Sequence, residues 1–162
     1  MRNSLFVRGM LAAFVAASSV APLSVKADPL GDAQALVGKT CPKLFNAGGN
    51  AFPGYKVPKG FVTVTLGDGW VFPMEKGDAR FAFLVTGLGE SGCKVDDVVA
   101  LPDKAHANAW LQCHERDAMI EGFGMRLAGR KDIVGWWTID HGKLKKMTET
   151  KGVLCQEPET GD

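Results

Sequence analysis

Five polar or reactive residues follow one another at positions 113–117, in the order Cys-His-Glu-Arg-Asp. A thiolate beside an imidazole can act as a nucleophile, and an imidazole with a carboxylate can transfer protons. This run supports one hypothesis for the function, a small hydrolase or metal-dependent enzyme that uses His114, Glu115 and Asp117. The alternative is a charged hairpin turn between a strand that ends near residue 113 and a strand that starts near Ala118.

The other residues that could carry chemistry fit known patterns less well. Ser91 is the only serine after residue 27, but a hydrolase nucleophile elbow needs a glycine two positions after the serine, where Cys93 stands. His106, His114 and His141 match no compact spacing of metal ligands. We therefore expect neither a cofactor nor a metal in the function favoured below.

The first 27 residues have the order of a secretory signal peptide. Arg2 and Arg8 precede an apolar run over 10–23, and the apolar Val25 and the small Ala27 suit cleavage before Asp28. A membrane anchor fits less well, because the run is shorter than the ~20 residues that a bilayer needs and contains Pro22. We predict a periplasmic or secreted protein, with no membrane insertion after signal removal.

Four cysteines, an even number, lie in the predicted mature chain, and an oxidising compartment would pair them. Three pairings are possible. We favour Cys93 with Cys113, which would close a modest loop between neighbouring elements. The remaining bridge, Cys41 with Cys155, would then tie the two ends of the domain together.

The charge and the length limit the function classes. The formal net charge of +1 becomes −2 without the three basic residues of the predicted signal peptide. A near-neutral chain without a concentrated basic face gives no support for a nucleic-acid partner. Residues 28–162 are enough for one domain with a single core. We therefore expect a single globular domain and no nucleic acid.

Short apolar stretches separated by glycines indicate a mainly β fold, that is, a β-rich α+β domain. Residues 61–66 are rich in β-branched types, and residues 80–86 are almost continuously apolar, as in a central strand covered on both faces. Pro73 is expected to stop a strand over 70–72. The remaining expected elements are a short helix over 32–37, an irregular loop over 39–60, a strand over 95–101 and a helical turn over 104–108.

Alternating residue types over 109–150 predict a β-meander, with a tight turn at His141-Gly142. With two disulfides and one or two short helices, this meander would belong to an antiparallel sandwich or a partly open barrel. A large ring opposite a strand glycine would cover the bare backbone. The expected pairs are Leu127 with Ile133, Phe123 with Trp137, Gly124 with Trp136, Ile139 with Leu144, Thr138 with Lys145, and Trp136 with Met147.

These registers place Arg126, Trp136, Lys143 and Lys145 on one face of the meander. A flat aromatic ring flanked by cations could receive a sugar, an aromatic ligand or the acidic edge of a protein. The alternative is that Trp136 shields the glycines while the cations keep the surface soluble. We favour an exported, non-catalytic binding or inhibitor-type domain, whose partner is another exported or envelope protein or an envelope glycan. The exported hydrolase is the second hypothesis.

Overall fold

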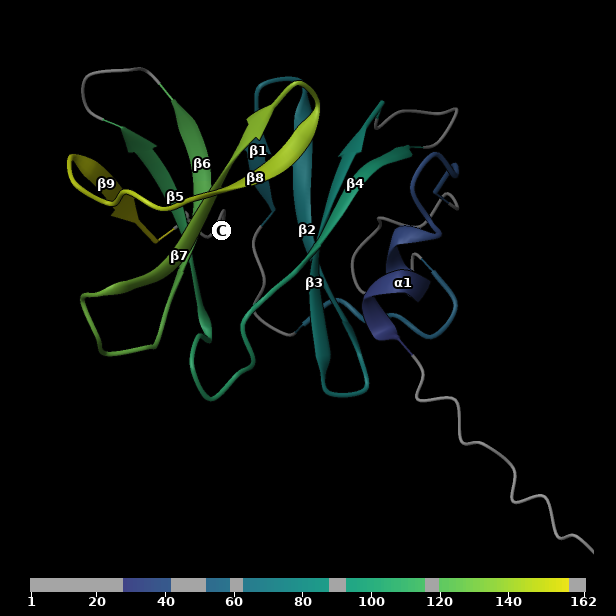
Figure 1. The fold of residues 1–162 in the computed structure, drawn as a ribbon, viewed down its shortest axis with the longest axis horizontal. Coiled ribbons are helices and arrows are strands. Elements are labelled where there is room, and N and C mark those ends of the chain that lie inside the picture. The colour runs from purple at the N-terminus through teal and green to yellow at the C-terminus, as the bar shows by residue number, and fades with distance from the viewer. Residues whose placement is uncertain (1–27, 42–51, 59–62, 88–92, 116–119, 158–162) are drawn as a thin grey trace, which may run out of the picture.

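Two antiparallel sheets lie side by side in the computed structural model, and a short helix lies outside one of them (Figure 1). The predicted mainly β fold is therefore confirmed. The predicted signal peptide and much of the loop expected over 39–60 lie outside the described residues. The structure describes residues 28–41, 52–58, 63–87, 93–115 and 120–157.

The N-terminal sheet has the strand order β1-β2-β3-β4. The run expected to be a central strand is β3, which pairs with β2 on one side and β4 on the other and is buried from residue 80 to residue 85. That prediction is confirmed, because a strand covered on both faces needs no polar side. The strands are β1 (Val64–Leu66), β2 (Gly69–Lys76), β3 (Ala79–Thr86) and β4 (Lys94–Ala100).

Pro73 does not end its strand, so that expectation is wrong. β2 continues to Lys76, and Pro73 lies opposite Ala82 of β3. The neighbouring strand β1 begins at Val64, which pairs with Val71. Beyond that pair β1 no longer accompanies β2, and a proline there removes no hydrogen bond between these two strands.

The C-terminal sheet contains the predicted meander and one further strand, in the order β8-β7-β6-β5-β9. The strand β9 pairs with β5, at the opposite edge from β8. The chain must therefore cross the sheet between residues 147 and 153. The strands are β5 (Ala109–Glu115), β6 (Glu121–Arg126), β7 (Ile133–Asp140), β8 (Lys143–Met147) and β9 (Val153–Gln156).

The registers expected within the meander are confirmed, with one exception. Phe123 lies opposite Trp137, Gly124 opposite Trp136, Ile139 opposite Leu144, Thr138 opposite Lys145 and Trp136 opposite Met147. The exception is Ile133, which lies opposite Arg126 rather than Leu127, because the register shifts after Met125. The two-residue turn is also present, with positive φ angles of 51° at His141 and 73° at Gly142.

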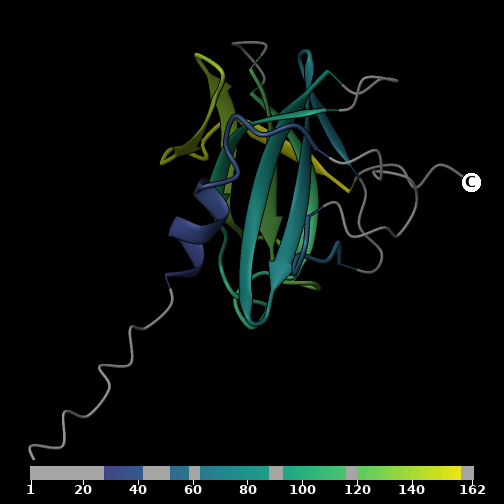
Figure 2. The same cartoon turned by 90° about the vertical axis from the view of Figure 1, so that its right-hand side faces the viewer.

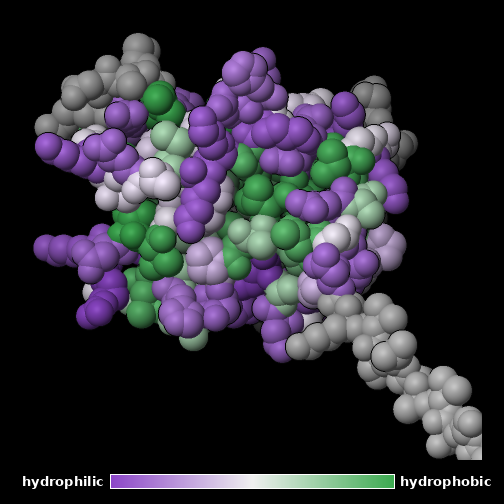
Figure 3. Space-filling view, in the orientation of Figure 1, coloured by the Kyte–Doolittle hydropathy of each residue, from purple (hydrophilic) through white to green (hydrophobic). Residues whose placement is uncertain are grey.

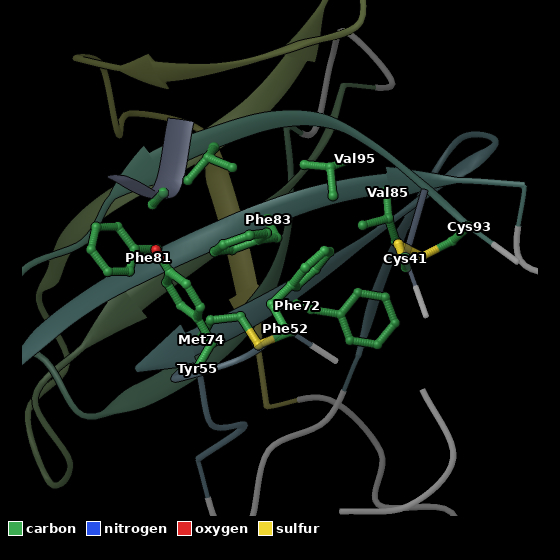
Figure 4. Close-up of a cluster of buried hydrophobic side chains, with 12 residues drawn as sticks. Cys41, Phe52, Tyr55, Phe72, Met74, Phe81, Phe83, Val85, Cys93 and Val95 are labelled. Carbon is green, nitrogen blue, oxygen red and sulfur yellow. A yellow bond between two sulfur atoms is a disulfide. The ribbon is translucent and has the colours of Figure 1, made fainter. Parts of the chain in front are cut away.

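The main core lies between the two sheets. The rings of Phe123 and Trp137 stack there with their centroids 5.0 Å apart. A second cluster covers the other face of the N-terminal sheet, where Phe52 and Tyr55 pack against Phe83 of β3 (Figure 4). The N-terminal sheet is therefore covered on both faces.

The helix α1 (Pro29–Gln34) lies outside the N-terminal sheet (Figure 2). It starts earlier than the helix expected over 32–37, because the Asp28 side chain accepts a hydrogen bond from the amide of Leu30 and Pro29 occupies the first turn. Gly38, with a φ of 84°, ends the following turns. Among the described residues, no helix is long and apolar enough to span a bilayer.

The disulfides join Cys41 to Cys93 and Cys113 to Cys155, so the favoured pairing is wrong. Thr40 forms a bridge with Lys94, which brings Cys41 beside Cys93. Cys155 of β9 lies directly opposite Cys113 of β5. The Cys113–Cys155 bridge thus joins two neighbouring strands of one sheet, and the Cys41–Cys93 bridge joins the segment before Cys41 to the start of β4. Neither bridge ties the two ends of the domain. Two disulfides are typical of proteins from an oxidising compartment.

Candidate functional site

Trp136 is buried, with only 1% of its surface exposed, so it offers no flat aromatic surface to a ligand. It lies on the outer face of the C-terminal sheet, since its neighbour Trp137 points into the core between the sheets. A Cβ atom built on Gly122 would lie 2.9 Å from Cε3 of Trp136. The ring therefore covers the strand glycines, as the alternative explanation proposed.

The burial of Trp136 depends on the segment that crosses from β8 to β9 (Figure 1). The indole Nε1 of Trp136 donates a 2.7 Å hydrogen bond to the carbonyl oxygen of Glu149 within this segment. Met147, Val153 and the Cys113–Cys155 disulfide pack in the same outer cluster. The crossing segment and its neighbours thus cover the outer face of the C-terminal sheet, which was expected to bind a partner.

The three cations expected beside Trp136 are each held by another partner. Arg126 donates to the carbonyl oxygen of Arg130 at 3.1 Å and pairs with Glu157. Lys143 donates to the backbone carbonyl of Asp96 at 2.9 Å. The third cation, Lys145, donates to Asp140 at 2.8 Å. The structure therefore does not join these side chains and Trp136 into one binding surface.

The structure describes only two of the three residues of the enzyme hypothesis. His114 is exposed and Glu115 half-buried at the end of β5, and Asp117 lies outside the described residues. Cys113 is bonded to Cys155, so it is no thiolate nucleophile. His106 contacts Asp103 and His141 contacts Asp140, each in a separate turn. In the part of the chain that is described, no three His, Cys, Asp or Glu side chains are grouped to hold a metal ion.

The β1–β2 and β7–β8 turns lie at the same end of the sandwich (Figure 1). Residues of both turns line a cleft of about 510 Å³. We call it the end cleft. Residues of both sheets line it, and its apolar part comes from Leu66, Leu84, Ile120 and Ile139. In the space-filling view, apolar residues gather over the middle of the molecule between polar margins (Figure 3). The lining of the end cleft combines these apolar side chains with polar groups and is open to solvent.

Local sequence explains why the end cleft stays open on the side of β2. Gly67 takes a positive φ of 55°, which lets the chain reverse between β1 and β2. A Cβ atom at Gly69 would lie 2.9 Å from Cδ1 of Leu84. Because Gly69 has no side chain, the side chain of Leu84 can occupy its position in the lining of the cleft.

The charged groups among the described residues that line the end cleft are all acidic: Asp68, Asp96 and Glu121. The hydroxyl groups are already used as donors, because Thr86 donates to Asp96 at 2.5 Å and Thr138 donates to the carbonyl oxygen of Glu121 at 2.8 Å. Asp96 also has Lys94 3.5 Å away. Among the described residues, no ion pair includes Asp68 or Glu121, so these two carboxylates are available to a ligand.

The sequence does not predict the end cleft, because the described residues that line it come from six strands and three turns. No short motif records that Asp68 and Glu121 belong to one site. The Gly-Asp-Gly sequence at 67–69 indicates a turn, and a turn alone does not indicate a cleft. His114, from the enzyme hypothesis, lies opposite Glu121 in the register of β5 and β6 and is thus one strand away from the lining.

No protein-family model matches this chain, and neither the curated proteins nor the solved structures contain a match.

Proposed function

We propose that this chain is an exported, non-catalytic binding domain that receives its ligand in the end cleft. The observation that carries the proposal is a cleft of about 510 Å³ with an apolar floor and a few polar groups at its margin. Small-molecule sites have this size and this mixture of lining groups. The proposal keeps the binding function expected from the sequence and moves its location from the face around Trp136 to the end of the sandwich.

Export is supported by the composition of residues 1–27 and by the two disulfides. Cleavage before Asp28 would leave the N-cap of α1 intact, because Asp28 itself is that cap. The test is N-terminal sequencing of the protein from periplasmic and extracellular fractions. Export predicts a chain that begins at Asp28, and a protein that keeps Met1 and four free thiols would contradict it.

The chemistry of the cleft also narrows the partners expected from the sequence. None of the described residues that line the cleft is aromatic, so this part of the lining offers no ring on which a sugar would stack. An envelope glycan is therefore less well supported than an occupant that inserts an apolar group. An apolar group could belong to a small molecule or to a side chain of another exported protein.

Binding in the end cleft can be tested by NMR titration of the protein with a library of small organic molecules. We expect binders to shift the backbone amide signals of Leu66, Glu121 and Ile139. Ile139→Trp, which fills the cleft, should abolish these shifts. The matched variant Ile133→Trp enlarges a half-buried side chain of the outer cluster and should leave them unchanged. Binders that map to another surface, or that bind Ile139→Trp equally well, would refute the proposal.

The exported hydrolase remains the second candidate, because His114 lies directly opposite the cleft residue Glu121. Hydrolysis of small aromatic esters by the purified protein should then depend on His114. Measurement of the rate for the wild-type protein and for His114→Gln tests this candidate. Equal rates for the two proteins, or no hydrolysis by either, would end it.

A further inference from the structure

We propose that the end cleft selects a cationic amphiphile, a small molecule with an apolar body and an ammonium or guanidinium head. This inference rests on the proposed function, since it names the ligand class of the same cleft. It is carried by three properties of the lining: its apolar floor, the sign of its charges and the hydrogen bonds that its hydroxyl groups already make.

The floor of the end cleft suits an apolar body. Leu66 and Leu84 are 2% and 1% exposed, and they belong to the core cluster between the sheets. Ile139 is half-buried beside them on β7. An apolar group placed here would extend the existing core, and each methylene that leaves water stabilises the complex. A purely polar cation would gain nothing from this floor.

The charges at the margin favour a cation. Asp68 and Glu121 are exposed, and neither takes part in an ion pair among the described residues. Lys94 and Lys143, the cations beside Asp96, line a neighbouring hollow whose described residues share only Asp96 and Gly142 with the end cleft. At Asp68 and Glu121, which form no ion pair with a described lysine or arginine, an anionic ligand would therefore meet a like charge, and a cationic ligand would meet its complement.

The hydrogen-bonding groups of the lining also favour a cationic ligand. The hydroxyl groups of Thr86 and Thr138 already donate to acceptors of the protein. The carboxylates of Asp68, Asp96 and Glu121 have further capacity to accept hydrogen bonds, and they do not donate them when ionised. A ligand that hydrogen-bonds to these carboxylates must bring its own donors. An ammonium or guanidinium group brings several donors together with the matching charge.

The test compares three probes with the same apolar body and different heads: n-octylamine, 1-octanol and octanoate. Protein from the full-length gene, with both disulfides intact, is titrated with each probe at pH 7 and followed by NMR. We expect octylamine to shift the amide signals of Leu66, Glu121 and Ile139 and to bind at least about fivefold more tightly than octanol, as two exposed ion pairs allow. Octanoate should bind most weakly, and added salt should weaken only the binding of octylamine.

Two pairs of variants isolate the charges. Glu121→Gln and Asp68→Asn should each weaken octylamine binding about two- to fivefold and leave octanol binding unchanged. The matched controls are Glu149→Gln and Asp132→Asn, which remove one exposed carboxylate each outside the cleft lining. These controls should leave the affinity for octylamine unchanged, and thermal unfolding curves confirm that all four variants are folded.

The outcomes separate this inference from the proposed function. Equal binding of octylamine and octanol in the end cleft would overturn the preference for cations and leave the cleft as a binding site. A loss of octylamine affinity that is as large in the two control variants would overturn it too. Binding of none of the three probes in the cleft would refute both this inference and, together with the library titration, the proposed function.

Discussion

The indole nitrogen of Trp136 donates a hydrogen bond to the carbonyl oxygen of Glu149, over a distance of 2.7 Å. This contact fastens the segment that carries the chain from β8, at one edge of the C-terminal sheet, to β9 at the other. A residue that the sequence suggested for recognition is therefore a structural anchor.

Trp136→Phe should lower the free energy of unfolding by about 1–2 kcal/mol, because the hydrogen bond to Glu149 is lost while most of the ring remains. Trp136→Ala should lower it by about 3–5 kcal/mol, since a large buried side chain is removed. Urea unfolding followed by circular dichroism measures both. The control is Val134→Ala on the same strand, where the side chain is 42% exposed and a much smaller loss is expected. Equal losses for Trp136→Ala and Val134→Ala would contradict the anchoring role.

Gly122→Ala should destabilise the protein by about 1–3 kcal/mol. A Cβ atom at Gly122 would lie 2.3 Å from the backbone carbonyl oxygen of Trp137, so the two strands would have to move apart. Gly135→Ala is the matched control, because its Cβ atom would come no closer than 3.0 Å to a neighbour. Thermal unfolding should show a larger loss for Gly122→Ala, and the reverse order would show that the contact between β6 and β7 is looser than described.

Peptide mapping without reduction should recover peptides that link Cys113 to Cys155 and Cys41 to Cys93. Replacing Cys113 and Cys155 together by alanine should lower the free energy of unfolding by about 2–4 kcal/mol. The same variant should expose the amides of β9 to hydrogen exchange, because this short edge strand loses its covalent link to β5. The alanine pair at Cys41 and Cys93 is the control, since it should leave the protection of β9 unchanged.

Asp140 should contribute to the loss of stability in acid. The hydrogen bond from Lys145, followed by that from His141, lowers the pKa of Asp140 below its ordinary value of 3.8. The unfolded chain therefore takes up this proton at a higher pH than the folded protein does. The stabilisation is fully present above about pH 4 and is lost as the pH falls through the folded pKa.

Melting temperatures measured between pH 6 and pH 2 test the role of Asp140. The wild-type protein should lose more stability than Asp140→Asn does as the pH falls below about 4. Asp132→Asn removes another exposed carboxylate and serves as the control for net charge. Parallel curves for the wild-type protein and Asp140→Asn would show that Asp140 makes no such contribution.

Local patterns predicted much of the C-terminal sheet. The alternation of residues around Phe123 and Trp137, together with the turn at His141-Gly142, specified both the strands and their pairing. Strand register follows from neighbouring side chains and from turn geometry, and both can be read over a few residues. The continuously apolar run at 80–86 indicated the central strand β3 for the same reason.

The position of β9 could not be read in this way. No pattern within residues 153–156 indicates that β9 pairs with β5, on the far side of the sheet from β8. The chain segment that crosses the sheet before β9 allows the disulfide at Cys113 to form and covers Trp136. The end cleft has the same origin, because Asp68 and Glu121 come together only when the two sheets pack. The sequence alone determined the strands of the meander, the turn at His141-Gly142 and the even set of cysteines, since these depend on local propensity and spacing. The tertiary structure alone decided which cysteines pair, which aromatic rings are covered and where a cleft remains, since these depend on contacts between distant segments.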